Sequence, residues 1–248
     1  MGVIRATDLR KSYGTVDALD GLSFAVDRGE LFGFLGPNGA GKTSTIRVLT
    51  GQIEPDAGEV SVLGVDPVER PIETRRRAGI LPEQASPPSF LTPREYLEFV
   101  GEVRGLDPDR VADRAGRWAE RLGFESKLDT LHTDLSRGQQ QKVMIAQAFL
   151  HEPDVVFIDE PLANLDPLVQ EQVKAFLVGY AAADNAVFVS THNIEVAEAI
   201  CTRVGIVADG RLVAERSVSD ATDASLLELF LDRVSDEAAR DLPACSTA

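Results

Sequence analysis

Short apolar stretches in the first third of the chain predict β-strands. Apolar and polar residues alternate along residues 3–9 and 22–26, which is the pattern of half-buried strands. Residues 31–35 form a continuous apolar run, which is typical of a strand buried on both faces. A helix is expected to follow over residues 42–49, ended by a glycine at position 51.

The second half of the chain also predicts strands, separated by a helix. Residues 155–158 and 186–190 are further apolar runs that predict buried strands, with a helix over about residues 168–179 between them. Residues 204–214 predict a hairpin, because an Asp-Gly pair at its centre supplies a two-residue turn. Strands that alternate with helices indicate an α/β fold with a mainly parallel core sheet.

Two further segments are predicted to be helical. Residues 93–122 have apolar positions on one side of a helix and are punctuated by prolines, so we expect an insert into the sheet. A short amphipathic helix is expected over residues 225–234. The last dozen residues are expected to be frayed.

Composition and charge limit the class of protein. Of 248 residues, 44% are apolar and 26% charged, which is ordinary for a globular protein and excludes a fibre or a disordered tail. No stretch approaches the roughly 18 uncharged apolar residues of a membrane span, and charges at Arg5 and Asp8 interrupt any signal segment. We therefore expect a cytosolic chain that would need a partner's anchor to work at a membrane.

The charge balance is strongly acidic. Forty acidic residues against 25 basic ones give a net charge of −15, which argues against a nucleic-acid binder. Only five of the basic residues are lysines, so the composition fits either a salt-adapted cytoplasm or an ordinary acidic protein. Cys201 and Cys245 lie outside any CxxC or Cys/His cluster, so reduced thiols and no zinc site are expected.

The most specific motif is GPNGAGKT at residues 36–43, between a predicted strand and a predicted helix. Its glycines let the backbone turn so that N–H groups point at phosphate oxygens, and the helix start adds positive potential. The three glycines are Gly36, Gly39 and Gly41. Lys42 would reach the β- and γ-phosphates, and the Thr43 hydroxyl is a hard ligand for Mg²⁺. The alternative is a glycine turn with a chance lysine.

A pair of carboxylates ends the apolar run at residues 155–160, VVFIDE. Asp159 is expected to hold Mg²⁺, directly or through water. Glu160, one residue further, points elsewhere and is placed to polarise an attacking water. The alternative is that both carboxylates belong to a solvated rim.

Residues 135–139, LSRGQ, stand 20 residues before Asp159 and begin a helix near Gln139. This segment resembles the signature sequence of ATP-binding cassette (ABC) ATPases, and the resemblance extends from about residue 4 to residue 214 in the family's order. It implies the P-loop NTPase cassette fold, with a mainly parallel core sheet, an N-terminal antiparallel β subdomain and a helical insert. The implied ATPase domain is residues 1–216 with the insert at about 88–150, and residues 217–248 form a short acidic helical tail.

The resemblance also implies roles for individual residues. Tyr13 would stack on adenine, Gln84 would touch Mg²⁺ and sense the partner, and His192 would contact the γ-phosphate. Outside the family, Tyr13 would be a half-buried strand residue and His192 an ordinary polar histidine. The expected ATP-binding residues are Tyr13, Gly36, Pro37, Asn38, Gly39, Ala40, Gly41, Lys42, Thr43, Ser44, Gln84, Ser136, Gly138, Gln139 and Asp166. The expected ligands of Mg²⁺ are Thr43, Gln84 and Asp159. The expected catalytic residues are Lys42, Glu160 and His192.

The signature segment bears on the working unit. Ser136 and the N–H groups around Gly138 form a second anion-binding helix start, which cannot reach the chain's own phosphate loop if the insert projects sideways. In the family that it resembles, this segment closes on the ATP of a second cassette, and Asn164-Leu165-Asp166 crosses between subunits. A homodimer is the simplest arrangement, and a different partner cassette stays open. Arg137 replaces the family's usual glycine, and residues 161–166 depart from its usual run, so the packing of the crossing loop is in question.

One ATPase domain without a membrane segment resembles the energising subunit of a transporter, held at the inner face of the membrane by a separate integral membrane subunit. Residues 32–37, 91–96 and 225–231 resemble the export-type branch, which handles drugs, lipids, polysaccharide or sodium. Residues 84–96 are expected to dock the membrane subunit, or else form a plain loop. A soluble cassette ATPase of translation or DNA maintenance and a cofactor-assembly scaffold stay open as alternatives.

Overall fold

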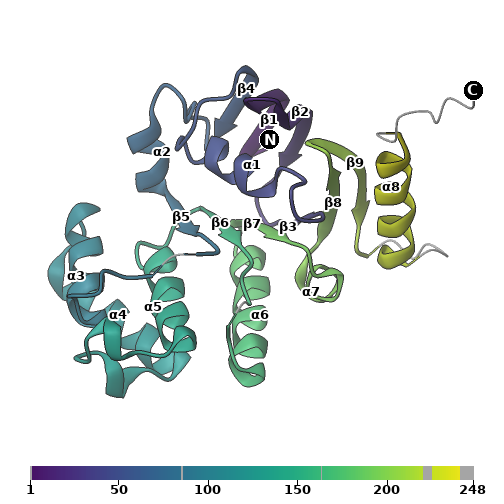
Figure 1. Ribbon diagram of the computed structural model, residues 1–248. Coiled ribbons are helices and arrows are strands. Elements are labelled where there is room, and N and C mark those ends of the chain that lie inside the picture. The colour runs from purple at the N-terminus through teal and green to yellow at the C-terminus, as the bar shows by residue number, and fades with distance from the viewer. Residues whose placement is uncertain (1, 85, 163, 220–224, 241–248) are drawn as a thin grey trace, which may run out of the picture.

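The apolar runs predicted as buried strands lie in a six-stranded central sheet (Figure 1). The computed structural model describes residues 2–84, 86–162, 164–219 and 225–240, the last six of these by their backbone only. The strand order is β5-β6-β7-β3-β8-β9, and all neighbours are parallel except the β8–β9 hairpin, which confirms the mainly parallel α/β core. The bounds are β3 (Leu31–Leu35), β5 (Ala78–Leu81), β6 (Val155–Asp159), β7 (Ala186–Thr191), β8 (Arg203–Ala208) and β9 (Arg211–Ser217).

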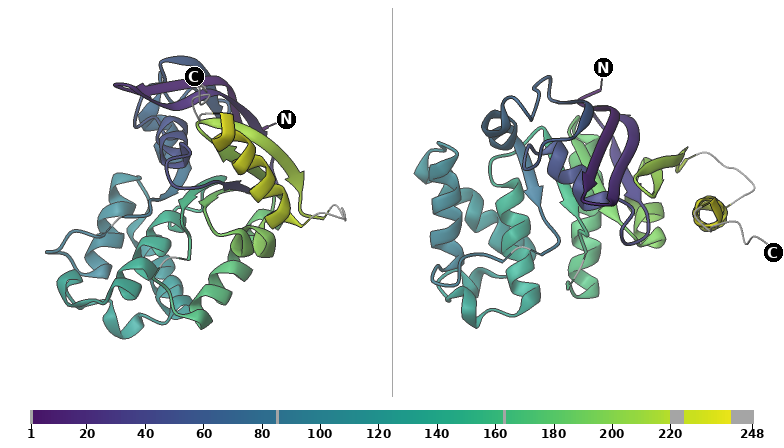
Figure 2. Two further views of the ribbon diagram at one scale, coloured as in Figure 1. Left: turned by 45° about the vertical axis from the view of Figure 1, so that its right-hand side comes forward. Right: turned by 45° about the horizontal axis from the view of Figure 1, so that its top comes forward.

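A second, three-stranded sheet covers one face of the central sheet together with helix α1 (Lys42–Leu49) (Figure 2). Its order is β2-β1-β4, all antiparallel, as the family resemblance implied. The bounds are β1 (Ile4–Tyr13), β2 (Val16–Val26) and β4 (Ala57–Val62), and β2 is longer than predicted. Phe24 of β2 stacks on Phe32 of β3, with ring centroids 5.8 Å apart, so aromatic burial joins the two sheets.

Helices α5 (Arg137–Phe149), α6 (Pro167–Ala182) and α7 (Ile194–Ile200) cover the opposite face (Figure 1). The strands serve both layers because successive side chains point to opposite faces. In β3, Leu31 and Leu35 join the core under these helices, whereas Phe32 and Phe34 join the core under the antiparallel sheet. This two-sided burial explains why the central strands are continuous apolar runs.

The helical middle is confirmed, as two helices rather than one. Helix α3 (Pro93–Val103) begins with a capping box between Thr92 and Glu95, and α4 (Pro108–Leu122) begins at the Asp107 cap. Each has proline in its first turn, where no backbone hydrogen bond is lost. Two short 3₁₀ turns, Glu125–Lys127 and His132–Asp134, lead on to α5, which starts at Arg137 rather than near Gln139.

The end of the described chain carries the expected hairpin and helix. Helix α8 (Leu226–Arg240) is amphipathic and packs against β8 and α7. Of the last dozen residues, which were expected to be frayed, 237–240 are helical and the rest lie outside the described part. The proposed start of the tail at residue 217 coincides with the last residue of β9. Among the described residues, none of the helices has the length and apolar character to cross a membrane.

The parallel register brings three strand ends together. Leu35 of β3 pairs with Thr191 of β7, and Asp159 of β6 pairs with Ser190 of β7. The loop after β3, the carboxylates at the end of β6 and the residues after β7 therefore share one edge of the sheet. Sites in parallel sheets form at this carboxyl edge.

Candidate active site

The loop at residues 36–41 joins the buried strand β3 directly to helix α1. Gly41 has a φ of 97°, and a Cβ on it would lie 2.3 Å from the carbonyl oxygen of Ala18. Gly36 has no positive φ, but a Cβ there would lie 2.4 Å from the carbonyl oxygen of Val207. The loop is therefore held between β2 and β8 by close backbone approaches that side chains would block.

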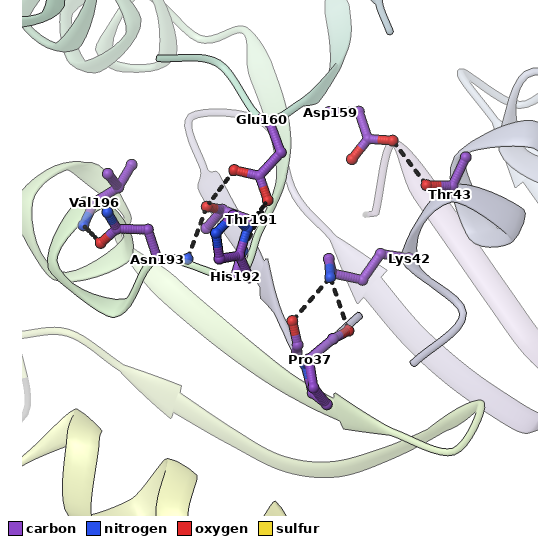
Figure 3. A network of polar contacts seen from close by, with 10 residues as sticks. Pro37, Lys42, Thr43, Asp159, Glu160, Thr191, His192, Asn193 and Val196 are labelled. Carbon is purple, nitrogen blue, oxygen red and sulfur yellow. Dashed lines mark hydrogen bonds and ion pairs between the residues drawn. The ribbon is translucent and has the colours of Figure 1, made fainter. Parts of the chain in front are cut away.

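Lys42 folds back over this loop (Figure 3). Its Nζ donates to the carbonyl oxygens of Gly36, at 2.8 Å, and Pro37, at 2.9 Å. Burial lowers the pKa of Lys42, and the nearby carboxylates of Glu160 and Asp159 oppose that shift. Among the described residues, the hydrogen bonds of this ammonium group go to these two neutral oxygens, which a phosphate oxygen could replace. The other expected loop residues, Asn38, Gly39, Ala40 and Ser44, lie on the loop and the first turn of α1.

Thr43 and Asp159 meet across the strand ends. The Thr43 hydroxyl donates to Asp159 Oδ2 at 2.9 Å, and Asp159 is only 4% exposed (Figure 3). Two ligands at adjacent corners of a Mg²⁺ octahedron, each about 2.0–2.1 Å from the ion, are also about 2.9 Å apart. The pair therefore fits Mg²⁺ in donor type and spacing. Within the described residues, no group of three or more His, Cys, Asp or Glu side chains is placed to hold a metal.

Glu160 turns away from Asp159 and is held in place by the residues after β7. It adopts a φ of 54°, a conformation uncommon for a residue with a side chain. Thr191 Oγ1 donates to Oε2 at 3.0 Å, the backbone N–H of His192 donates to Oε1 at 2.9 Å, and His192 Nδ1 lies 2.6 Å from the same oxygen. The carboxylate is 15% exposed, whereas the His192 side chain is 62% exposed. Glu160 is thus a fixed acceptor at the edge of solvent.

Thr191 is a residue of this cluster that the sequence reasoning missed. Besides Glu160, its hydroxyl accepts from the Asn193 backbone N–H at 3.1 Å, and Asn193 in turn caps α7. A polar run directly after a buried strand was the available signal, but only the strand register shows that it meets Glu160.

The signature residues form a separate group. Ser136 and Gln139 cap α5 reciprocally: Ser136 Oγ accepts from the Gln139 N–H at 3.3 Å, and Gln139 Oε1 accepts from the Ser136 N–H at 2.9 Å. A Cβ on Gly138 would lie 2.9 Å from the carbonyl oxygen of Asn164, so the loop after β6 packs on the start of α5. Asp166 caps α6 and lies 4.0 Å from Lys142 of α5.

These two groups are not joined. In the described part of the chain, no hydrogen bond or ion pair links residues 136–139 to residues 36–43. Figure 1 shows α5 on the side of the helical insert and α1 under the antiparallel sheet. Gln84 lies with Arg137 and Gln140 in a recess of about 570 Å³ beside α5. Tyr13, at the end of β1, is 44% exposed, with Lys11 Nζ 5.9 Å from its ring centroid.

The mainly parallel sheet, the phosphate loop after β3 and the carboxylates at the end of β6 define a nucleotide-binding α/β domain. A sequence profile of the ABC transporter family matches residues 19–163, and the chain belongs to that family. A solved structure, the ATP-binding subunit of an ABC transporter, is 32% identical with a TM-score of 0.86, covering 93% of this chain and 98% of that one.

Two curated relatives are similar over most of this chain. The probable multidrug ABC transporter ATP-binding protein YbhF of Escherichia coli (strain K12) is 35% identical over 88% of this chain, which spans only 38% of that protein. The Nod factor export ATP-binding protein I of Paraburkholderia xenovorans (strain LB400) is 36% identical over 90% of this chain and 74% of its own length.

Proposed function

We propose that this chain binds and hydrolyses ATP as the cassette subunit of an ABC exporter, and that its closure on a second cassette drives a separate membrane subunit. The observation that carries the proposal is the division of the site. A phosphate loop with its carboxylates lies in one place and the helix start built on Ser136 lies in another, with no bond between them in the described residues.

The phosphate loop binds the substrate's phosphates. Backbone N–H groups at the start of α1 point toward the anion, and Lys42 exchanges its two carbonyl partners for phosphate oxygens. Mg²⁺ held by Thr43 and Asp159, with Gln84 from the neighbouring segment, would neutralise phosphate charge and orient the oxygens. Tyr13 offers a half-exposed ring to the adenine.

Glu160 and His192 act on the terminal phosphate. Water attacks the γ-phosphorus, a new P–O bond forms, and the bond to the oxygen that bridges the β- and γ-phosphates breaks. Glu160 orients this water and accepts its proton, because Thr191 and the His192 N–H fix its carboxylate. His192 is held through Nδ1, which leaves its other nitrogen free to face the γ-phosphate.

A second cassette completes the pocket. The N–H groups that follow Ser136 present a helix start to anions, and the loop at residues 164–166 lies against it. In two copies that face each other head to tail, the N-terminus of α5 in each copy would contact the ATP bound by the other. A homodimer satisfies both sites with one sequence.

The membrane subunit would dock near residues 84–96, at the inner face of the membrane. Phe90 in this segment is 76% exposed, and the segment leads from the Gln84 recess into α3. Such a contact would couple the nucleotide site to the membrane partner. The names of the relatives, multidrug transport and Nod factor export, support export as the direction.

The test is the Glu160→Gln variant in gel filtration with light scattering. With ATP and Mg²⁺ it is expected to bind nucleotide without turnover and to elute as a dimer, while Glu198→Gln, an exposed control on α7, behaves as wild type. Unchanged turnover in Glu160→Gln removes this residue from the mechanism. Failure of the arrested variant to dimerise with bound ATP contradicts the shared pocket.

A further inference from the structure

A second recess lies between the helical insert and α6, away from the nucleotide site. Its volume is about 380 Å³, and its walls come from α4, the end of α5 and α6. Figure 1 shows α4 and α5 on one side and α6 on the other. We call it the arginine–aromatic recess, and six of its residues carry the argument: Arg117, Trp118, Arg121, Phe149, Phe176 and Tyr180.

The floor of the recess is a fixed set of aromatic rings. The Phe149 ring meets Phe176 edge to face at 4.8 Å and Tyr180 at 5.0 Å, and Trp118 meets Phe176 at 4.9 Å. The Tyr180 hydroxyl donates to the Pro153 carbonyl oxygen at 2.7 Å, so this ring cannot turn away. Trp118, Phe176 and Tyr180 are only partly buried, which leaves apolar ring surface facing the opening.

The rim is positive although the chain carries a net charge of −15. The Arg121 guanidinium carbon lies 5.3 Å from the Trp118 ring centroid and 4.9 Å from that of Phe176. Among the described residues, Arg121 has no carboxylate partner within ion-pair distance. Arg117 pairs with Asp113 at 3.1 Å, but both side chains are more than 60% exposed, so water competes well for that pair.

The third arginine of the recess, Arg114, already has protein partners. Arg114 is buried, donates to the Leu150 carbonyl oxygen at 2.9 Å and pairs with Glu152. It therefore neutralises the carboxylate of the recess, Glu152, which leaves Arg121 without an ion pair in the described part of the chain and Arg117 with only its exposed pair to Asp113. Because Arg121 lies on the rings, its planar group is held with N–H edges available for an acceptor.

We propose that the arginine–aromatic recess binds a small organic anion that carries a planar ring. The anionic group bonds to Arg121 and Arg117, and the ring packs on Phe176 and Tyr180, which keep ring surface toward the opening. The volume lies near the lower end of the range of ligand pockets, about 300–1,000 Å³, which suits a single ring. A bare anion would leave the aromatic floor uncovered, and a neutral ring would leave the guanidinium groups unused.

The test uses phenyl phosphate on the full chain, with saturating ADP and Mg²⁺ present to keep the probe from the phosphate loop. Trp118 is the chain's single tryptophan, so a change in its fluorescence reports on this recess. We expect a saturable change with phenyl phosphate and binding at least about tenfold weaker for inorganic phosphate and for phenol. Equal affinity for either comparator, or no saturable change with phenyl phosphate, overturns the proposal.

Variants locate the anionic contact. Arg121→Gln is expected to weaken phenyl phosphate binding about tenfold or more, whereas Arg110→Gln, an exposed control outside the recess on the same helix, leaves it unchanged. The affinities of both variants are measured by isothermal titration calorimetry. Fluorescence is not used here, because a substitution beside Trp118 changes the tryptophan emission even without ligand. Unchanged affinity in Arg121→Gln contradicts the assignment.

Discussion

Removing the Thr191 hydroxyl tests whether the Glu160 carboxylate must be held at one angle to work. Oε2 of Glu160 has a single hydrogen bond in the described residues, from the Thr191 hydroxyl at 3.0 Å. Oε1 is contacted by both the backbone N–H and the Nδ1 atom of His192. Thr191→Val replaces a buried hydroxyl by a methyl group of similar size. It frees one carboxylate oxygen and leaves the other bonded.

The magnitude follows from that loss. A hydrogen bond to a charged group contributes about 1.5–3 kcal/mol, and the lower end applies because two contacts to Oε1 survive. A loss of about 1.5 kcal/mol in the transition state lowers kcat about tenfold. KM for ATP is expected to change less than about twofold, because Thr191 does not face the phosphates in the proposed arrangement.

The assay is steady-state phosphate release, with thermal unfolding by circular dichroism to show that the variants are folded. Thr191→Ser keeps the hydroxyl and is expected to retain most of kcat. A folded Thr191→Val with the wild-type kcat would refute the reasoning that Thr191 orients Glu160, and an equal loss in Thr191→Ser would assign the effect to packing.

Three further outcomes are expected. Lys42→Ala weakens ATP binding at least about tenfold in a nucleotide titration, because the phosphates lose the buried ammonium group, while Lys174→Ala binds as wild type; wild-type affinity in Lys42→Ala would contradict the role. Burial, aided by the charge of Arg104, holds the pKa of His151 at about 3, so only the unfolded chain takes up this proton below about pH 6.5, and the free energy of unfolding falls as pH drops from 6.5 toward 3. His151→Gln should remove up to about 1.4 kcal/mol per pH unit of that slope in denaturant titrations, and an identical slope would place the proton elsewhere. If the acidic composition reflects salt adaptation, ATPase activity requires molar salt, and full activity in dilute buffer would favour an ordinary acidic protein.

The phosphate loop and the central strands were predictable because local sequence determines them. The 42–49 helix has the predicted bounds, since glycines precede and follow a helix-forming run. Strand β4 was missed because Ala57, Gly58 and Glu59 are exposed and it exists by pairing with β1. Strand β5, with four residues, was too short to leave a pattern.

The candidate site was predictable in its members but not in its contacts. Spacing placed Asp159 and Glu160 at a strand end, and the bond from Thr43 to Asp159 follows from the sheet register. The packing of Asn164 on Gly138 depends on the docking of the insert on the core, which no periodicity encodes. The roles of Tyr13, Gln84 and Asp166 came from family resemblance and stay predictions.

The central claim is that ATP is enclosed only between two cassettes. The most direct test measures the ATPase rate per chain over a dilution series, while light scattering follows the oligomeric state. The account predicts that the rate per chain follows the dimer fraction and that Ser136→Arg, which blocks the start of α5, stays near background at every concentration. A full rate per chain in dilutions that contain only monomer, unaffected by Ser136→Arg, would contradict it.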